Sequence, residues 1–177
     1  MHTRNATPED AAWIAVLCYN QFQAAHQDAL QQEDLVYAVD KMFSLAPVTA
    51  DIQEKDNHYF AVTDEDNNPF GCVKLGPPEL DLAKEVKGAI ELTRFYINPE
   101  MIGKKIAHLL VNACVDFVKA NPQYNSIWLH VYEGNIRARR FYEKAGFTIE
   151  STQVYPVRNS RPTGIVMKLE VTHSFKR

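Results

Sequence analysis

The stretch IWLHVYEGNIRARRFYEKAGF, residues 127–147, decides the fold. With Ser126 it opens on a short, mostly apolar run, which is typical of a strand that is buried on both faces. Asn135 is a good helix N-cap, and Gly146 is a residue type that ends helices. The apolar side of the intervening helix carries Ala138, Phe141, Tyr142 and Ala145. The stretch therefore predicts a buried strand, a turn and a short helix.

The preceding segment, residues 88–121, predicts a second strand-to-helix junction. GAIELTRFYI reads as a strand that stops at Asn98-Pro99, and a helix follows from near Gly103 to near Asn121. Apolar residues keep the i, i+3, i+4, i+7 spacing of an amphipathic helix at Ile106, Leu109, Leu110, Ala113, Cys114, Phe117 and Val118. The unpaired N–H groups and the dipole at a helix N-terminus attract phosphates, and Lys104 and Lys105 add charge there. The segment matches neither the P-loop pattern nor the dinucleotide fingerprint.

The other segments predict one α/β domain with a mixed sheet over residues 1–177. Thr7 and Pro8 start a helix that runs to Phe22, and a second helix is expected from Glu33 to Leu45, before Pro47. A hairpin is expected from HYFAVTD and PFGCVKL, with EDNN as its turn. A loop or a frayed helix is expected from Leu75 to Lys87. The last two strands are expected at FTIESTQVY and TGIVMKLEV.

Composition excludes several classes of protein. The chain has 177 residues, with 19 Lys and Arg against 22 Asp and Glu, a formal net charge of −3 that argues against nucleic-acid binding. It has no apolar run of membrane-spanning length and no secretion signal, so we expect no membrane partner and a cytoplasmic location. Cys18, Cys72 and Cys114 are expected to be reduced core thiols, and the six histidines lack the paired spacing of a metal site.

Residues 127–147 resemble the second cofactor motif of the GNAT superfamily of N-acetyltransferases. The matching positions are Asn135, Ala138, Phe141, Tyr142, Lys144, Gly146 and Phe147. The earlier junction is similar to the family's main acetyl-CoA motif at Pro99, Glu100, Gly103 and Ala107. Two positions depart from that motif: Ile102 replaces a Gln or Arg, and Lys105 replaces a Gly. ELTRFYI and IWLHVYEGN look most like bacterial spermidine/spermine N-acetyltransferases.

The resemblance implies an α+β fold, with a single central mixed, mostly antiparallel sheet, splayed middle strands and helices on both faces. The splayed strands would be residues 91–97 and 126–131. Acetyl-CoA would be the co-substrate, with no metal. Its implied contacts are the main chain of Phe95, Tyr96 and Ile97, the N–H groups of Ile102, Gly103, Lys104, Lys105, Ile106 and Ala107, and Asn135, Arg137, Tyr142 and Lys144. A helical backbone at Lys105 would let its side chain point away from the phosphates.

The family's reaction is direct attack of an amine on the thioester. By resemblance, Tyr142 would protonate the leaving thiolate and Glu91, through a water, would deprotonate the amine. The first two helices and the loop between the last two strands would line the acceptor side. The helices carry carboxylates and aromatic rings that suit a polyamine: Glu33, Asp34, Asp40, Tyr19, Tyr37 and Phe22. Another small amine, an aminoglycoside, an amino acid or a peptide N-terminus would also fit. A non-catalytic acyl-CoA-binding module is the alternative of a different class, and a homodimer is one assembly that the resemblance allows.

Overall fold

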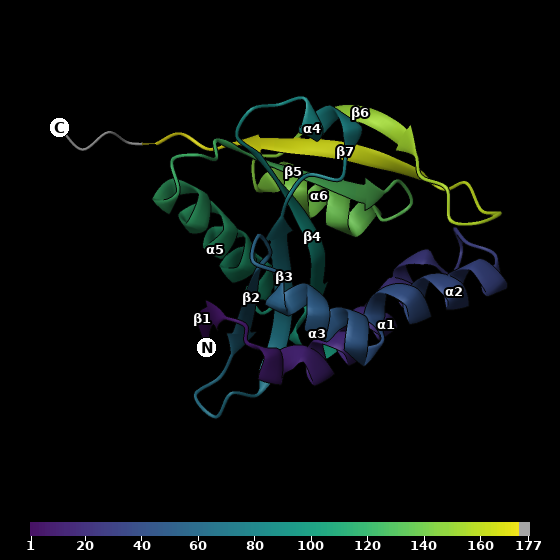
Figure 1. Ribbon diagram of the computed structural model, residues 1–177, viewed down its shortest axis with the longest axis horizontal. Coiled ribbons are helices and arrows are strands. Elements are labelled where there is room, and N and C mark those ends of the chain that lie inside the picture. Colours follow the sequence, from purple (N-terminus) through teal and green to yellow (C-terminus); the bar gives the residue numbers. More distant parts are fainter. Residues whose placement is uncertain (174–177) are drawn as a thin grey trace.

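The computed structural model describes residues 1–173, which form a seven-stranded sheet covered by helices on both faces (Figure 1). The strand order is β1-β2-β3-β4-β5-β7-β6. The strands are β1 (His2–Asn5), β2 (His58–Thr63), β3 (Pro69–Gly76), β4 (Ala89–Ile97), β5 (Ser126–Tyr132), β6 (Thr148–Val154) and β7 (Thr163–Glu170). Every neighbouring pair is antiparallel except β4 and β5, which are parallel. The predicted mixed, mostly antiparallel sheet is confirmed.

Two large apolar cores and a small cluster around Ala83 and Trp128 hold the helices against the sheet. The helices are α1 (Ala11–His26), α2 (Gln32–Phe43), α3 (Leu45–Gln53), α4 (Asp81–Lys84), α5 (Ile106–Ala120) and α6 (Ile136–Lys144), with 3-10 turns η1 (Pro8–Asp10) and η2 (Pro99–Met101). One core joins α5 and α6 to the sheet around Leu110 and Tyr142, and the other joins α1, α2 and α3 around Ile14 and Val39. Burial of these side chains supplies most of the stabilisation.

The helix boundaries differ from the expected ones in three places. The second helix ends before Pro47 as predicted, but α3 begins at Leu45 and contains that proline. Proline is tolerated there because the N–H groups in the first turn of a helix have no intrahelical acceptor, so a residue without an N–H loses no hydrogen bond. Helix α1 continues past Phe22 to His26, and α5 begins at Ile106 rather than near Gly103.

Strands β4 and β5 separate partway along their length, and we call this opening the fork. Their pairing covers Ala89–Leu92 of β4 and Ser126–Leu129 of β5. Both strands continue beyond these residues, so the backbone groups of β4 that face β5 lose their strand partner there. A bulge in the β3–β4 pairing coincides with Arg94, whose φ is +49°. The predicted splayed middle strands are thus confirmed.

The described residues also bear on cysteines, metals and membranes. Cys18, Cys72 and Cys114 are buried and free, as expected of core thiols. Residues 1–173 contain no group of three or more His, Cys, Asp or Glu side chains that could hold a metal ion. Within the same range, every helix is too short or too polar to cross a membrane.

Candidate active site

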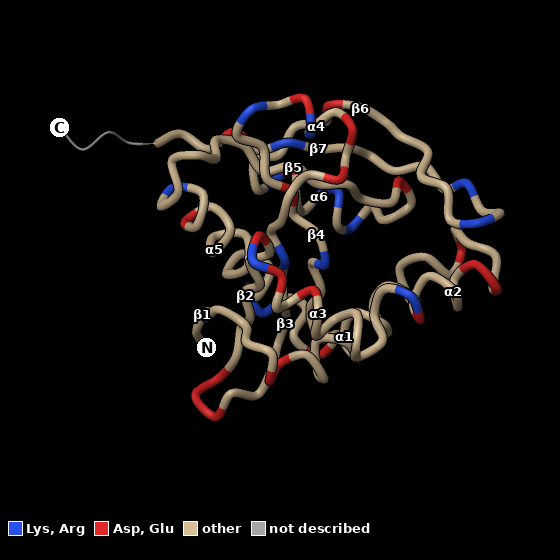
Figure 2. The backbone as a smooth tube through the Cα atoms, viewed as in Figure 1, with Lys and Arg blue, Asp and Glu red and all other residues tan. Residues whose placement is uncertain are grey.

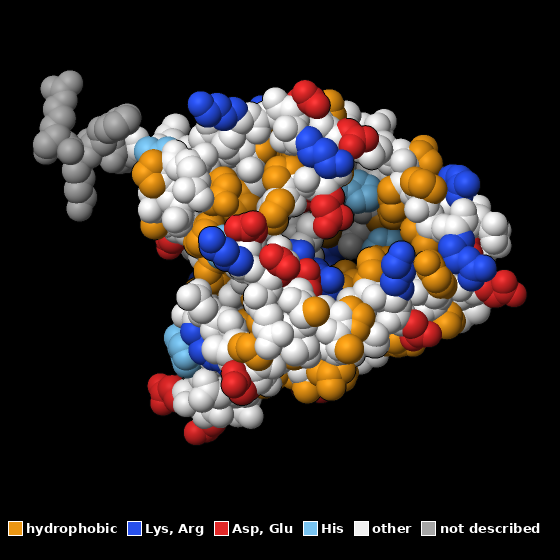
Figure 3. Space-filling view, viewed as in Figure 1, with side chains coloured by type: hydrophobic (Ala, Val, Ile, Leu, Met, Phe, Trp, Pro, Cys, Tyr) orange, Lys and Arg blue, Asp and Glu red, His pale blue; other side chains and the backbone are white. Residues whose placement is uncertain are grey.

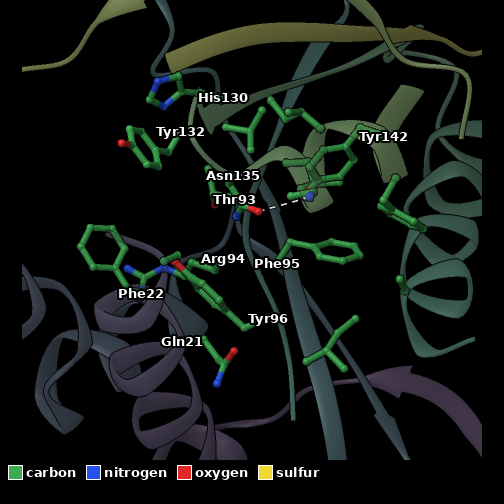
Figure 4. A pocket seen from close by; sticks show the side chains of 18 of the residues that line it. Gln21, Phe22, Thr93, Arg94, Phe95, Tyr96, His130, Tyr132, Asn135 and Tyr142 are labelled. Atoms are coloured by element: carbon green, nitrogen blue, oxygen red, sulfur yellow. Dashed lines mark hydrogen bonds between the residues drawn. The ribbon is translucent and has the colours of Figure 1, made fainter. Parts of the chain in front are cut away.

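A cavity of about 940 Å³ opens at the fork. Figure 3 shows the hollow in the surface, with histidine side chains inside it, and Figure 4 shows its lining from close by. We call one part the α6 half, which is lined by the η2–α5 loop, α6 and Phe95. The other part, the α1 half, is lined by α1, the connection between β6 and β7, and side chains of β4 and β5. In Figure 4, His130 and Tyr132 lie on one side of the opening and Tyr142 on the other.

The η2–α5 loop provides unpaired backbone donors to the α6 half. The N–H groups of Ile102 and Lys104 donate to the carbonyls of Pro99 and Met101, each at 3.2 Å. The other N–H groups of this loop and of the first turn of α5 have no acceptor among residues 1–173: those of Gly103, Lys105, Ile106 and Ala107. Four donors at the N-terminus of a 15-residue helix make an anion-binding concavity.

Lys105 does not have the expected helical backbone. It occupies the N-cap of α5 with φ +65°, in the left-handed region that glycine adopts without strain. Lys105 nevertheless lines the cavity, so its positive charge adds to the donors of the loop. This conformation explains physically why a glycine suits the position.

Of the four basic residues that were expected near the cofactor, two line the cavity and two do not. Arg137 lines the cavity together with Lys105, but Lys104 and Lys144 do not. The Lys104 ammonium lies 3.7 Å from the Met101 sulfur on the surface. Figure 2 shows basic residues along α6. A charged rim and two lining cations therefore favour an anionic ligand in this half.

Helix α6 holds two predicted site residues through its N-cap and its aromatic face. The Asn135 side-chain oxygen accepts the Ala138 N–H at 3.2 Å, drawn as the dashed line in Figure 4, so the predicted cap is confirmed. Tyr142 lines the cavity although it is 6% exposed, and its ring centroid lies 5.8 Å from that of Phe95. Burial raises the pKa of Tyr142, so its hydroxyl is a proton donor at neutral pH.

The predicted main-chain contacts on β4 all line the cavity. Phe95 and Ile97 pack into the α5 core, whereas Tyr96 packs into the α1–α3 core, so their side chains alternate across the sheet. Their backbone lies beyond the last residue that pairs with β5. This part of β4 therefore offers main-chain donors and acceptors to an extended ligand.

Glu91 lies in the cavity lining on the paired part of β4. One carboxylate oxygen accepts the N–H groups of Glu79, at 2.6 Å, and of Leu80, at 3.0 Å. Burial raises the pKa of Glu91, and these two hydrogen bonds only partly oppose that shift. A raised pKa makes the carboxylate a stronger base than an exposed one, which suits proton transfer.

Several residues of the α1 half were missed from the sequence. The Arg94 guanidinium lies over the Phe43 ring at 5.1 Å, is 3.1 Å from an Asp51 oxygen and donates to the Met42 carbonyl. Thr93, His26, His130 and Tyr155 also line the cavity. Thr93, Arg94 and His130 lie in the quoted segments ELTRFYI and IWLHVYEGN, but none of them is a motif position. The one usable signal was a histidine within the apolar run SIWLHV.

The acidic residues of the early helices are not brought into the cavity. Asp34 is buried in α2, where one oxygen accepts the N–H groups of Asn159 and Ser160 and the Ser160 hydroxyl at 2.7–3.1 Å. Asp34 thus fixes the β6–β7 connection to α2. Of the other residues that were expected to face an acceptor, Phe22 lines the cavity. The remaining four do not line it: Glu33, Asp40, Tyr19 and Tyr37.

Comparison with known proteins gives a consistent set of matches. A family model described as the Acetyltransferase (GNAT) family matches residues 18–147. An uncharacterised N-acetyltransferase of Schizosaccharomyces pombe is 29% identical over 109 residues, which are 62% of this chain and 61% of that protein. The chain thus matches less than two thirds of that relative's length.

Two solved structures show the same fold. The PaiA N-acetyltransferase from Thermoplasma acidophilum, in complex with coenzyme A, superposes with a TM-score of 0.77 at 19% identity, covering 96% of this chain and 98% of that one. The spermidine N-acetyltransferase from Vibrio cholerae, in complex with CoA and spermine, has a TM-score of 0.66 at 22% identity, covering 95% and 94%.

Proposed function

Because the chain belongs to the acetyltransferase (GNAT) family, we propose that it transfers an acetyl group from acetyl-CoA to a primary amine by direct attack. The observation that carries the proposal is the fork, which opens beside four free N–H groups at the start of α5. The pantetheine arm would pair with the exposed backbone of residues 95–97, and the pyrophosphate would accept from the η2–α5 loop. Asn135 and Arg137 would line the same path, and Lys104 and Lys144 would act from the rim.

The proposed chemistry uses Glu91 and Tyr142. An alkylamine with a pKa near ~10.4 is mostly protonated at neutral pH, so it must lose a proton before it attacks. The amine nitrogen then bonds to the thioester carbon and the carbon–sulfur bond breaks. Glu91, through a water, takes the proton that the ammonium loses before attack, and Tyr142 donates a proton to the departing thiolate. The second proton, which the nitrogen loses as the amide forms, restores the Tyr142 hydroxyl through solvent. Backbone N–H groups of β4 beyond the fork would stabilise the oxyanion.

The proposed acceptor is a small primary amine. A polyamine is the second candidate, because the carboxylates of Glu79 and Glu91 line the cavity and could pair with a distant ammonium group. The likeness to a spermidine N-acetyltransferase is one of fold and does not extend to substrate. A single-domain cytoplasmic enzyme that forms a homodimer stays a prediction from the family resemblance.

Two measurements on the purified chain test the proposed function. Calorimetric titration of acetyl-CoA should give low-micromolar or tighter binding. Thiol release from acetyl-CoA should then depend on an added amine, with a panel of monoamines, polyamines, amino acids and peptides. Binding without transfer to any amine would favour the non-catalytic acyl-CoA-binding module. No binding at millimolar acetyl-CoA would overturn the proposal.

A further inference from the structure

Thr93 and His130 are the first residues of β4 and β5 beyond the point where the fork opens. The last paired residues are Leu92 on β4 and Leu129 on β5, and Thr93 and His130 are the next residue on each strand. Side chains alternate along a strand, and Glu91 lies opposite Trp128. Thr93 and His130 therefore project to the same face of the sheet as Glu91, on either side of the opening.

Three buried polar atoms in this region have no hydrogen-bond partner within residues 1–173. They are the Thr93 hydroxyl oxygen, His130 Nε2 and the Tyr155 hydroxyl oxygen, and all three side chains line the cavity. The Tyr155 ring meets the His130 ring edge-on, with centroids 4.2 Å apart. An unsatisfied buried polar group costs about 1–3 kcal/mol, so three in one cavity lining point to a ligand that satisfies them.

The His130 ring packs against the backbone of a glycine on the neighbouring strand. A Cβ atom at Gly164 of β7 would lie 1.5 Å from His130 Nε2, so the ring occupies space that only glycine leaves free. Burial lowers the pKa of His130 to about 4, with a smaller contribution from His26. The ring is therefore neutral at neutral pH, which leaves one ring nitrogen able to accept a hydrogen bond.

Aromatic side chains form the wall beyond these three atoms. His26 stacks on Phe22 with ring centroids 4.0 Å apart and lies 5.8 Å from the Tyr132 ring. All three rings line the cavity, and the α1 and β6–β7 lining contains no Asp or Glu. The wall therefore suits an apolar or aromatic carbon chain better than a second positive charge.

We propose that Thr93, His130 and Tyr155 form the seat of the acceptor amine, and that the acceptor is a monoamine on an apolar or aromatic carrier. This proposal rests on the proposed function and names its substrate class. The three groups come from β4, β5 and the β6–β7 connection, they line the same cavity, and each can accept a hydrogen bond from an N–H group of the amine. Thr93 is two residues from Glu91 on the same face of β4, so the seated amine lies beside the proposed base.

Thr93→Val and Tyr155→Phe test the seat, since each removes a hydroxyl and keeps the shape of the side chain. We expect either variant to raise the KM for 2-phenylethylamine about 5- to 10-fold, which is the loss of one hydrogen bond. The Kd for acetyl-CoA should stay unchanged. The thermal midpoint should stay the same or rise, because an unsatisfied buried group is removed. A merely structural role would instead lower the thermal midpoint and leave the KM unaffected.

Gly164→Ala tests the histidine without replacing it, because the added methyl group displaces the His130 ring. We expect it to raise the KM for the amine and to leave acetyl-CoA binding unchanged. Tyr37→Phe is the matched control, since Tyr37 lies on α2 outside the cavity lining. An unchanged amine KM in all three seat variants would overturn the proposal, as would an equal rise in the control. Spermidine with a higher kcat/KM than 2-phenylethylamine would overturn the monoamine assignment.

A binding measurement separates this proposal from the proposed function. 2-Phenylethylamine is titrated by calorimetry into the chain saturated with CoA, which cannot react. Binding that weakens in Thr93→Val and Tyr155→Phe supports the seat even if the chain transfers no acetyl group. No binding of the amine to the parent chain overturns the seat, whatever the transfer assay gives.

Discussion

The α6 half and the α1 half of the cavity recognise their ligands with different parts of the chain. The α6 half offers mainly backbone, from the fork and from the free N–H groups of the η2–α5 loop. The α1 half offers mainly side chains, which come from several separate elements. Backbone recognition tolerates many sequences, whereas side-chain recognition depends on residue identity. One half can thus bind a common cofactor while the other changes its acceptor.

Tyr142→Phe should have the largest effect, because Tyr142 is the one side chain of the α6 half to which we assign chemistry. We expect kcat to fall roughly 100-fold, since proton transfer to the thiolate is lost. The Kd for acetyl-CoA and the thermal midpoint should stay the same, because the phenyl ring keeps its contact with Phe95. Steady-state kinetics and calorimetry measure both. An unchanged kcat would make the α6 half a purely backbone site.

Glu91→Gln should have an intermediate effect and tests the polar base of the α1 half. We expect kcat to fall roughly 10-fold, because a water-mediated base is partly replaced by solvent. The pKa of Glu91 is raised, so the parent activity should decline as pH falls through a value above that of an exposed glutamate. The variant should lose this decline.

Glu79→Gln is the control for Glu91→Gln, since Glu79 is a second carboxylate in the cavity lining. Its backbone N–H, which donates to Glu91, is kept by the substitution. A similar loss of activity in Glu79→Gln, or an unaltered pH profile in Glu91→Gln, would remove the base role from Glu91.

Lys105→Gly should have the smallest effect and tests whether the α6 half depends on side chains. Glycine relieves the left-handed strain at φ +65°, so we expect the free energy of unfolding to rise by about 1 kcal/mol. The Kd for acetyl-CoA should change less than about 5-fold, because a surface charge contributes about 1 kcal/mol or less. Chemical denaturation measures the first and calorimetry the second.

Lys104→Gly is the control for Lys105→Gly, since Lys104 is not among the non-glycine residues with positive φ. A glycine there relieves no strain and should lower stability slightly. A loss of stability in Lys105→Gly would contradict the relief of backbone strain. A loss of acetyl-CoA binding far greater than about 5-fold would show that the lysine side chain itself holds the cofactor.

Sequence patterns predicted the α6 half better than the α1 half. The helix that Asn135 caps and Gly146 ends was predicted because both signals are local. The splayed strands came from the family resemblance, and pairing of β4 and β5 confirms them. The predicted helical backbone of Lys105 was wrong, because this residue is the N-cap that precedes α5. Helical periodicity does not predict the backbone conformation of a residue just before a helix.

The α1 half was predicted poorly because its residues meet only through tertiary structure. Asp34 reads as an exposed acid on an amphipathic helix, yet it is buried beneath Ser160, 126 positions further along the chain. Helix α3 was missed because Pro47 is a helix breaker by default and is permitted only in the first turn. His130 stood within the quoted stretch, but its unpartnered nitrogen depends on Gly164 of another strand.

The fork has a thermodynamic consequence for the folded chain as a whole. Its separated strands leave main-chain groups that an extended ligand can pair with only when the sheet is formed, so such a ligand binds the native state alone. Linkage then adds about 2.7 kcal/mol to the free energy of unfolding at a ligand concentration 100 times the Kd. For a chain of this size, each kcal/mol moves the melting temperature by about 2–4 °C. The melting temperature of this protein should therefore rise with the concentration of free cofactor.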